Sequence, residues 1–102
     1  MFRALVLDKA DDRFGFDLAD LTDDDLPEAD VLVDVEYSTV NYKDALAVTD
    51  SSPVVRMWPM VPGIDLAGRV AESDREEVPV GTYVVVNGWG LGETWWGGYA
   101  QR

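Results

Sequence analysis

The residues best suited to chemistry in this sequence lie together in the segment "NYKD", Asn41 to Asp44. They bring an amide, a phenol, an ammonium and a carboxylate into one turn of chain, where they could converge on a substrate carbonyl. An amide or phenol that donates a hydrogen bond stabilises the negative charge that develops on such an oxygen. On a helix only Asn41 and Asp44 share a face. Because a helix start also favours these two residue types, spacing alone leaves a catalytic cluster and a simple helix cap equally open.

A second group of candidates lies in the glycine- and tryptophan-rich segment 87–102, "NGWGLGETWWGGYAQR". It contains neither G-x-x-x-x-G-K-[ST] nor G-x-G-x-x-G, so its spacing disfavours a nucleotide phosphate loop. If exposed, Trp89, Trp95 and Trp96 could stack on a sugar or a flat ring. The alternative is a loop whose tryptophans pack on the protein's own core. Arg56 suits an anionic ligand, although pairing with a carboxylate competes with that role.

The composition narrows the possible chemistry. The 102 residues include no cysteine and no histidine, which removes disulfides, thiolate nucleophiles, imidazole bases and the usual zinc ligands. Twenty acidic residues against eight basic ones give a net charge of -12, which would repel nucleic acid. Abundant aspartate with scarce lysine is typical of proteins from a salt-rich cytoplasm, where charge repulsion is screened. An acidic patch on an ordinary protein is the alternative.

The elements that must position these residues are predicted to be short strands within one domain. Segments 2–8 and 13–20 are expected to form a hairpin around a turn at Asp11 and Asp12. Segment 21–30 is expected to be a surface loop or a single helical turn. Alternation in 31–38 predicts a strand with Val31, Val33, Val35 and Tyr37 facing inward.

The second half of the chain continues this pattern after one short helix, predicted over 41–48. The three prolines of 53–63 predict a loop, and the strand that follows carries Asp65 on its outward face. Gly68 in that strand indicates a bulge or a close backbone approach. We expect 83–87 to be a buried strand and 97–102 to begin another. This order predicts a mainly β barrel or sandwich with little helix. No apolar run is long enough for a membrane span and no secretory signal is evident, so we expect a cytoplasmic protein.

Three segments taken in order resemble one known family: "STVNYKDALAVTD", "WPMVPGIDLAGRV" and "NGWGLGETWWGGYAQR". They resemble the N-terminal catalytic domain of the medium-chain dehydrogenase/reductase superfamily. Within it they are most similar to the zinc-free acryloyl-CoA reductase and quinone oxidoreductase family. The resemblance implies a GroES-like, partly open β-barrel with one or two short helices, interrupted before the barrel closes. Residues 1–102 would form the N-terminal part of this alcohol-dehydrogenase-type domain, without the Rossmann cofactor domain.

The resemblance also implies a reaction and its residues. The expected activity is the NADPH-dependent reduction of an activated carbon–carbon double bond in an acryloyl-CoA, enone or quinone type of substrate, without a metal. By position in the family motif, Asn41, Tyr42 and Asp44 would be catalytic, and Asn41, Tyr42 and Lys43 would bind the cofactor. The candidates named above for anion binding and stacking would bind the substrate: Arg56, Trp89 and Trp95. Trp95 stands where the family often has a histidine.

Two further expectations concern the chain by itself. It should be inactive, because the cofactor cleft of this family lies between two domains. It should also self-associate, because strands without neighbours expose unpaired backbone groups. The alternative function is a stand-alone small β-barrel that binds a ligand through Trp89, Trp95 and Trp96.

Overall fold

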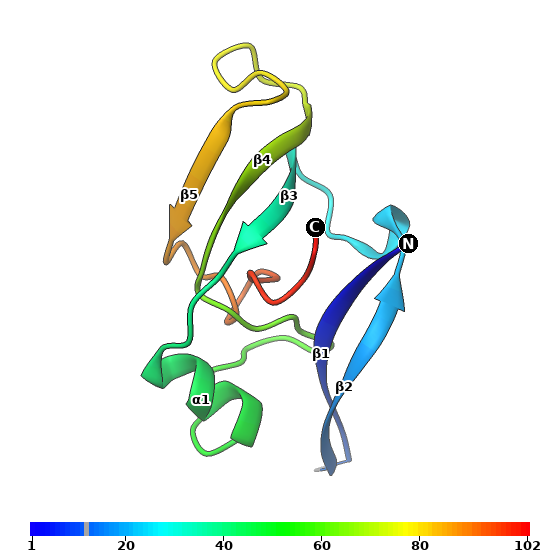
Figure 1. Ribbon diagram of the computed structural model, residues 1–102. Coiled ribbons are helices and arrows are strands. Elements are labelled where there is room, and N and C mark those ends of the chain that lie inside the picture. The colour runs from blue at the N-terminus through cyan, green and yellow to red at the C-terminus, as the bar shows by residue number, and fades with distance from the viewer. Residues whose placement is uncertain (12) are drawn as a thin grey trace.

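The computed structural model describes residues 1–11 and 13–102, which fold mainly as β-strands (Figure 1). The strands are β1 (Phe2–Ala10), β2 (Arg13–Leu21), β3 (Val31–Tyr37), β4 (Asp65–Ser73) and β5 (Tyr83–Asn87). The helical elements are a single 3-10 turn, η1 (Asp23–Asp25), and one helix, α1 (Tyr42–Thr49). No helix in the described part of the chain has the length and apolar character needed to cross a membrane.

Strands β1 and β2 form the predicted antiparallel hairpin, in a register that runs from Phe2 opposite Leu21 to Ala10 opposite Arg13. The turn predicted at Asp11 and Asp12 lies partly outside the described residues. Both faces of β1 contribute to the core, since Phe2 and Ala4 are buried on one face and Leu7 is buried on the other. The opposite edge of β2 has no partner strand among the described residues. The hairpin therefore contributes one buried strand and one largely exposed strand.

Strands β3, β4 and β5 form an antiparallel sheet with β4 in the centre. Its register against β3 shifts twice, between Leu32 and Val33 and again before Tyr37. The second shift leaves Glu36 of β3 without a partner on β4, and an extra residue of this kind changes the face to which the next side chain of its strand points. The prediction that Tyr37 faces inward is therefore wrong, since it is 74% exposed. Leu32, expected on the outward face, instead helps to line an apolar cavity.

Strand β5 is an edge strand that pairs only with β4 in the described structure. Val84 and Val86 line an apolar cavity beside this sheet, whereas Tyr83 and Val85 are about two-thirds exposed. The prediction that 83–87 is a buried strand is therefore wrong for the face that carries Tyr83 and Val85. An unbroken run of valines fits a strand covered on both faces, but β5 is covered on one face only.

The C-terminal end of the chain joins the two sheets (Figure 1). On one side, the Leu5 N–H donates to the Tyr99 carbonyl at 2.9 Å, and the Gln101 N–H donates to the Arg3 carbonyl at 3.0 Å. On the other side, the Val35 N–H of β3 donates to the Gln101 carbonyl at 2.9 Å. These few residues thus continue the backbone hydrogen bonding from the hairpin to the three-stranded sheet.

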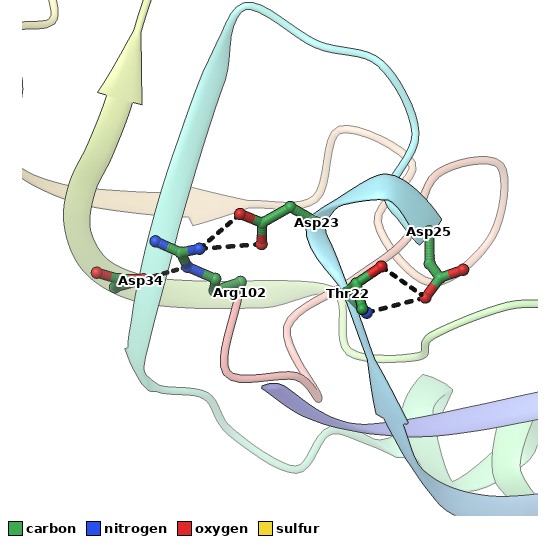
Figure 2. Close-up of polar contacts among 5 residues, drawn as sticks. All are labelled: Thr22, Asp23, Asp25, Asp34 and Arg102. Carbon is green, nitrogen blue, oxygen red and sulfur yellow. Dashed lines mark hydrogen bonds and ion pairs between the residues drawn. The ribbon is translucent and has the colours of Figure 1, made fainter. Parts of the chain in front are cut away.

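Arg102 reinforces this junction with two carboxylates from different elements (Figure 2). Its Nε donates to Asp34 of β3 at 2.7 Å, and its terminal nitrogen lies 2.7 and 2.9 Å from the two oxygens of Asp23 in η1. Beside it, the Thr22 N–H donates to the Asp25 carboxylate at 2.9 Å, which caps the same 3-10 turn. One guanidinium therefore ties the tail, the turn and the sheet together.

The core consists of two small apolar clusters and an open apolar cavity. One cluster is centred on Leu7 and Met60, and the other on Phe2 and Val61. A cavity of about 290 Å³ lies against the three-stranded sheet, lined mainly by aliphatic side chains of β3, β4 and β5, by residues of 26–29 and by the tryptophan segment. The two sheets stay separate, so the described residues do not close into a full barrel. The predicted mainly β, partly open architecture is confirmed.

Candidate functional site

The "NYKD" segment begins helix α1, as the sequence predicts. Asn41 is the N-cap, with extended backbone angles, and it forms a capping box with Asp44 at the third helical position. The Asn41 N–H donates to Asp44 Oδ2 at 2.9 Å, and Asp44 Oδ1 accepts the Ile64 N–H at 3.2 Å. Asp44 is only 2% exposed. Its carboxylate therefore faces inward, where it fixes the helix start against the segment leading into β4.

A second carboxylate, Asp65 at the start of β4, completes a polar network around Asn41. The Asn41 amide nitrogen lies 3.0 Å from Thr39 Oγ1, 3.1 Å from Asp44 Oδ2 and 3.3 Å from Asp65 Oδ2. Thr39 Oγ1 is also 2.8 Å from both oxygens of Asp65. The amide thus lies between two carboxylates that would otherwise repel each other. The network orients Asn41 and joins the beginning of α1 to β4.

Tyr99 closes the network from the C-terminal segment. Its hydroxyl donates to the Thr39 carbonyl at 2.9 Å. Desolvation on burial, followed by the negative charges of Asp44 and Asp65, raises the pKa of Tyr99 to about 12. The phenol is therefore protonated at neutral pH and acts as a hydrogen-bond donor within the protein.

The two middle residues of the motif point away from this network. Tyr42 is 81% exposed, and its hydroxyl has no hydrogen-bond partner among residues 1–11 and 13–102. Lys43 Nζ lies 2.8 Å from a carboxylate oxygen of Glu93, so the helix is linked to the tryptophan segment. The structure thus divides the motif into an inward pair, Asn41 and Asp44, and an outward pair, Tyr42 and Lys43.

The predicted substrate residues lie around the same tryptophan segment. The Arg56 N–H donates to the Glu93 carbonyl at 2.8 Å, which places the proline-rich loop beside it. Trp89 is 87% exposed and Trp95 is 43% exposed. Trp96 differs from them, because its indole N–H donates to the Pro59 carbonyl at 3.0 Å and its ring packs against both apolar clusters. The segment is therefore partly a core element and partly an exposed surface.

Sequence reasoning missed part of the network. Thr39 and Tyr99 were not among the candidates, and Asp65 was noted only as an outward-facing carboxylate. Two sequence signals were available. One is the Pro62-Gly63 turn followed by Asp65, and the other is the pair of glycines at 97–98 followed by Tyr99. Neither pattern shows that the two segments meet. Among the described residues, no group of three or more potential ligand side chains is arranged to hold a metal ion.

Comparison with known proteins agrees with this architecture. The family described as the alcohol dehydrogenase GroES-like domain matches residues 27–101. "Acrylyl-CoA reductase AcuI" of Ruegeria pomeroyi is 48% identical over 104 residues, covering 100% of this chain and 32% of the relative. "Putative quinone oxidoreductase YhfP" of Bacillus subtilis is 35% identical over 101 residues, covering 99% of this chain and 31% of the relative. The chain thus spans about a third of the length of these curated relatives.

A solved structure leads to the same conclusion. The yhdH oxidoreductase of Salmonella enterica, in complex with NADP, superposes with a TM-score of 0.92 and 43% identity. The match covers 97% of this chain and 31% of that protein. Together with the family match over residues 27–101, this confirms the family predicted from the three motif segments. The chain belongs to the family of alcohol dehydrogenase GroES-like domains.

Proposed function

We propose that this chain is the substrate-facing part of the catalytic domain of a zinc-independent, NADPH-dependent oxidoreductase that reduces an activated carbon–carbon double bond. The observation that carries the proposal is the 48% identity to an acrylyl-CoA reductase along the whole chain. The quinone oxidoreductase relative is 35% identical, so we favour an acryloyl thioester over a quinone. Because the matched relatives are about three times longer, we assign the cofactor domain to protein outside residues 1–102.

The exposed first turn of α1 fits the reacting end of such a site. Tyr42 presents a phenol that no described residue engages, on a helix whose start is fixed by the buried network of Asn41 and Asp44. NADPH, when bound, supplies the hydride that goes to the β-carbon of the substrate. In the proposal, the Tyr42 hydroxyl donates a hydrogen bond to the substrate carbonyl and stabilises the developing enolate charge. Asn41 and Asp44 hold that turn in place, and Lys43 contacts the cofactor.

The absence of histidine and cysteine supports the zinc-free assignment, because the usual zinc ligands in proteins are drawn from these residues and carboxylates. Two further facts weigh against a stand-alone binding module built on three tryptophans. Trp96 is committed to the core through Pro59 and both apolar clusters. Residues 1–102 also align, over almost their whole length, with about a third of longer enzymes.

The test is a chimera in which residues 1–102 replace the matching third of the Ruegeria pomeroyi reductase. We expect the chimera to oxidise NADPH when acryloyl-CoA is added. Tyr42→Phe should lower kcat by about 100-fold, the usual effect of removing one donor to a developing oxyanion. Tyr37→Phe is the matched control, because Tyr37 is similarly exposed but lies on β3. A folded chimera that binds NADPH but leaves acryloyl-CoA unreduced would contradict the proposal.

The isolated chain provides a second check. Without a cofactor domain, NADPH should give no saturable fluorescence change at micromolar concentrations. A micromolar binding curve would show that the described residues bind the cofactor by themselves, which contradicts the assignment of cofactor binding to another domain.

A further inference from the structure

Trp89 has an unusual backbone conformation for an aromatic residue. Its φ is 57°, between Gly88 at 76° and Gly90 at 77°. A bulky side chain in this left-handed region is strained, and such strain is found most often at functional sites. Yet Trp89 is 87% exposed, so contacts within the described chain do little to offset that strain. The indole ring of Trp89 is therefore exposed to solvent and available to stack on the flat ring of a ligand.

The position of Trp89 places it near the candidate site. Asn87 lies opposite Asp65 in the pairing of β5 with β4, and the Gly88 N–H donates to the Ile64 carbonyl at 2.9 Å. Asp65 is part of the network that holds Asn41. Trp89 therefore leaves the sheet at the same end as the first turn of α1.

The backbone of a basic residue, Arg56, lies next to the same loop. The Arg56 N–H binds the Glu93 carbonyl at 2.8 Å, and the Glu93 N–H binds the Gly90 carbonyl at 3.0 Å. The Glu93 carboxylate is already paired with Lys43 at 2.8 Å. Arg56 forms no ion pair with any residue in 1–11 or 13–102, in a chain of net charge -12. The exposed Arg56 side chain, which has no ion-pair partner among the described residues, is therefore available to an external anion.

We propose that Trp89 and Arg56 form a subsite for a phosphorylated adenine nucleotide. The adenine ring stacks on Trp89, and a phosphate group binds the Arg56 guanidinium, whose planar fork suits phosphate. This inference rests on the proposed function, because coenzyme A carries such a nucleotide as the handle of an acryloyl thioester. NADPH carries the same chemistry, so the test separates the two sources.

The first experiment uses the 15N-labelled chain and coenzyme A as the probe. The four tryptophans give four indole N–H signals. We expect coenzyme A to shift the Trp89 signal in a saturable way, at about millimolar concentrations. The Trp96 indole is the internal control, because its N–H is already bound to Pro59. If the Trp89 signal does not move up to the solubility limit, or moves no more than that of Trp96, the proposal is wrong.

Variants separate stacking from charge. Trp89→Ala should weaken coenzyme A binding by about tenfold, the scale of one lost base–aromatic stack, measured through the backbone signals of residues 90–93. Arg56→Gln should weaken it several-fold and remove most of its salt dependence. Arg3→Gln is the matched control, since Arg3 is an exposed arginine of the hairpin. Equal affinity in all three variants would overturn the assignment. NADP in place of coenzyme A identifies the source, because the tighter of the two probes is the one that the subsite takes.

A kinetic test distinguishes this proposal from the function on which it rests. In the chimera, Trp89→Ala and Arg56→Gln should raise KM for acryloyl-CoA about tenfold. The same variants should leave KM for acryloyl-pantetheine unchanged, because that thioester lacks the nucleotide. If the chimera is active and both KM values stay constant, the subsite is refuted while the proposed function stands.

Discussion

Gly97 gives the sharpest test of how this fold is built. Residues 97–99 run against 61–63 through short backbone hydrogen bonds, from the Gly97 N–H to the Val61 carbonyl at 2.7 Å and from the Tyr99 N–H to the Pro62 carbonyl at 3.0 Å. A Cβ atom placed on Gly97 would lie 2.7 Å from the Pro62 oxygen and would also overlap the Gly63 oxygen. Both oxygens belong to the backbone and cannot rotate away. We therefore predict that Gly97→Ala separates the two segments.

The expected magnitude follows from two contributions. Forcing a methyl group into a packed site costs roughly 1–3 kcal/mol. Lengthening two or three backbone hydrogen bonds adds about 1 kcal/mol for each. Gly97→Ala should therefore lower the free energy of unfolding by roughly 3–6 kcal/mol, a large share of the 5–15 kcal/mol that is typical of a small domain.

Urea unfolding followed by tryptophan fluorescence measures this change. Gly15→Ala is the matched control, because no heavy atom beyond its chain neighbours lies within 4 Å of a Cβ at that position on β2. The control should stay within about 0.5 kcal/mol of the wild type. If Gly97→Ala falls within about 1 kcal/mol of the control, the argument from close backbone approach is refuted.

Four further predictions concern charge and association. The pKa of Tyr99 is raised from 10.0 to about 12, so the folded state favours the protonated phenol. The contribution of this phenol to the free energy of unfolding should be fully present below pH 10 and should be lost as the pH rises toward 12. Tyr99→Phe should flatten that fall in urea unfolding, and parallel curves would contradict it. Arg102→Gln should cost about 1 kcal/mol at low salt and less at high salt, whereas Arg3→Gln, whose pair with Asp20 is 3.9 Å long, should cost little. With a net charge of -12, the wild-type Tm should rise with added KCl, and a Tm independent of salt would count against charge repulsion. The unpaired edge of β5 should promote self-association, which a monodisperse monomer in light scattering at high concentration would exclude.

Local sequence signals predicted those parts of the fold that depend on near neighbours. The hairpin, the single turn near Asp23 and the start of α1 all follow from short patterns of alternation and capping. Asn41 and Asp44 are three residues apart, so their capping box can be inferred without knowing the rest of the fold. Gly68 was also predicted correctly, since a Cβ there would overlap the Asp34 carbonyl on β3.

The predictions that failed concern residues whose positions are set by partners distant in the sequence. Tyr37 faces outward because the pairing of β3 with β4 shifts register, and nothing within 31–37 reveals the partner's spacing. Val85 is exposed because β5 is an edge strand. The site network has the same origin: Thr39 meets Asp65 across 26 residues and Tyr99 across 60. Sequence alone identified the helix cap of the candidate site, and the tertiary pairing supplied the rest.

The junction made by the C-terminal end has a consequence for biosynthesis. The hairpin forms from the first 21 residues, but its hydrogen bonds to the other sheet run through residues 99–101, including the pair between Arg3 and Gln101 across 98 positions. On the ribosome, β1 can pack against Met60 and Val61 once these residues have emerged, but its hydrogen bonds to residues 99–101 can form only after nearly the whole segment is made. Contacts this distant in sequence slow folding. The junction between the two sheets is therefore expected to be among the last contacts that this segment forms during synthesis.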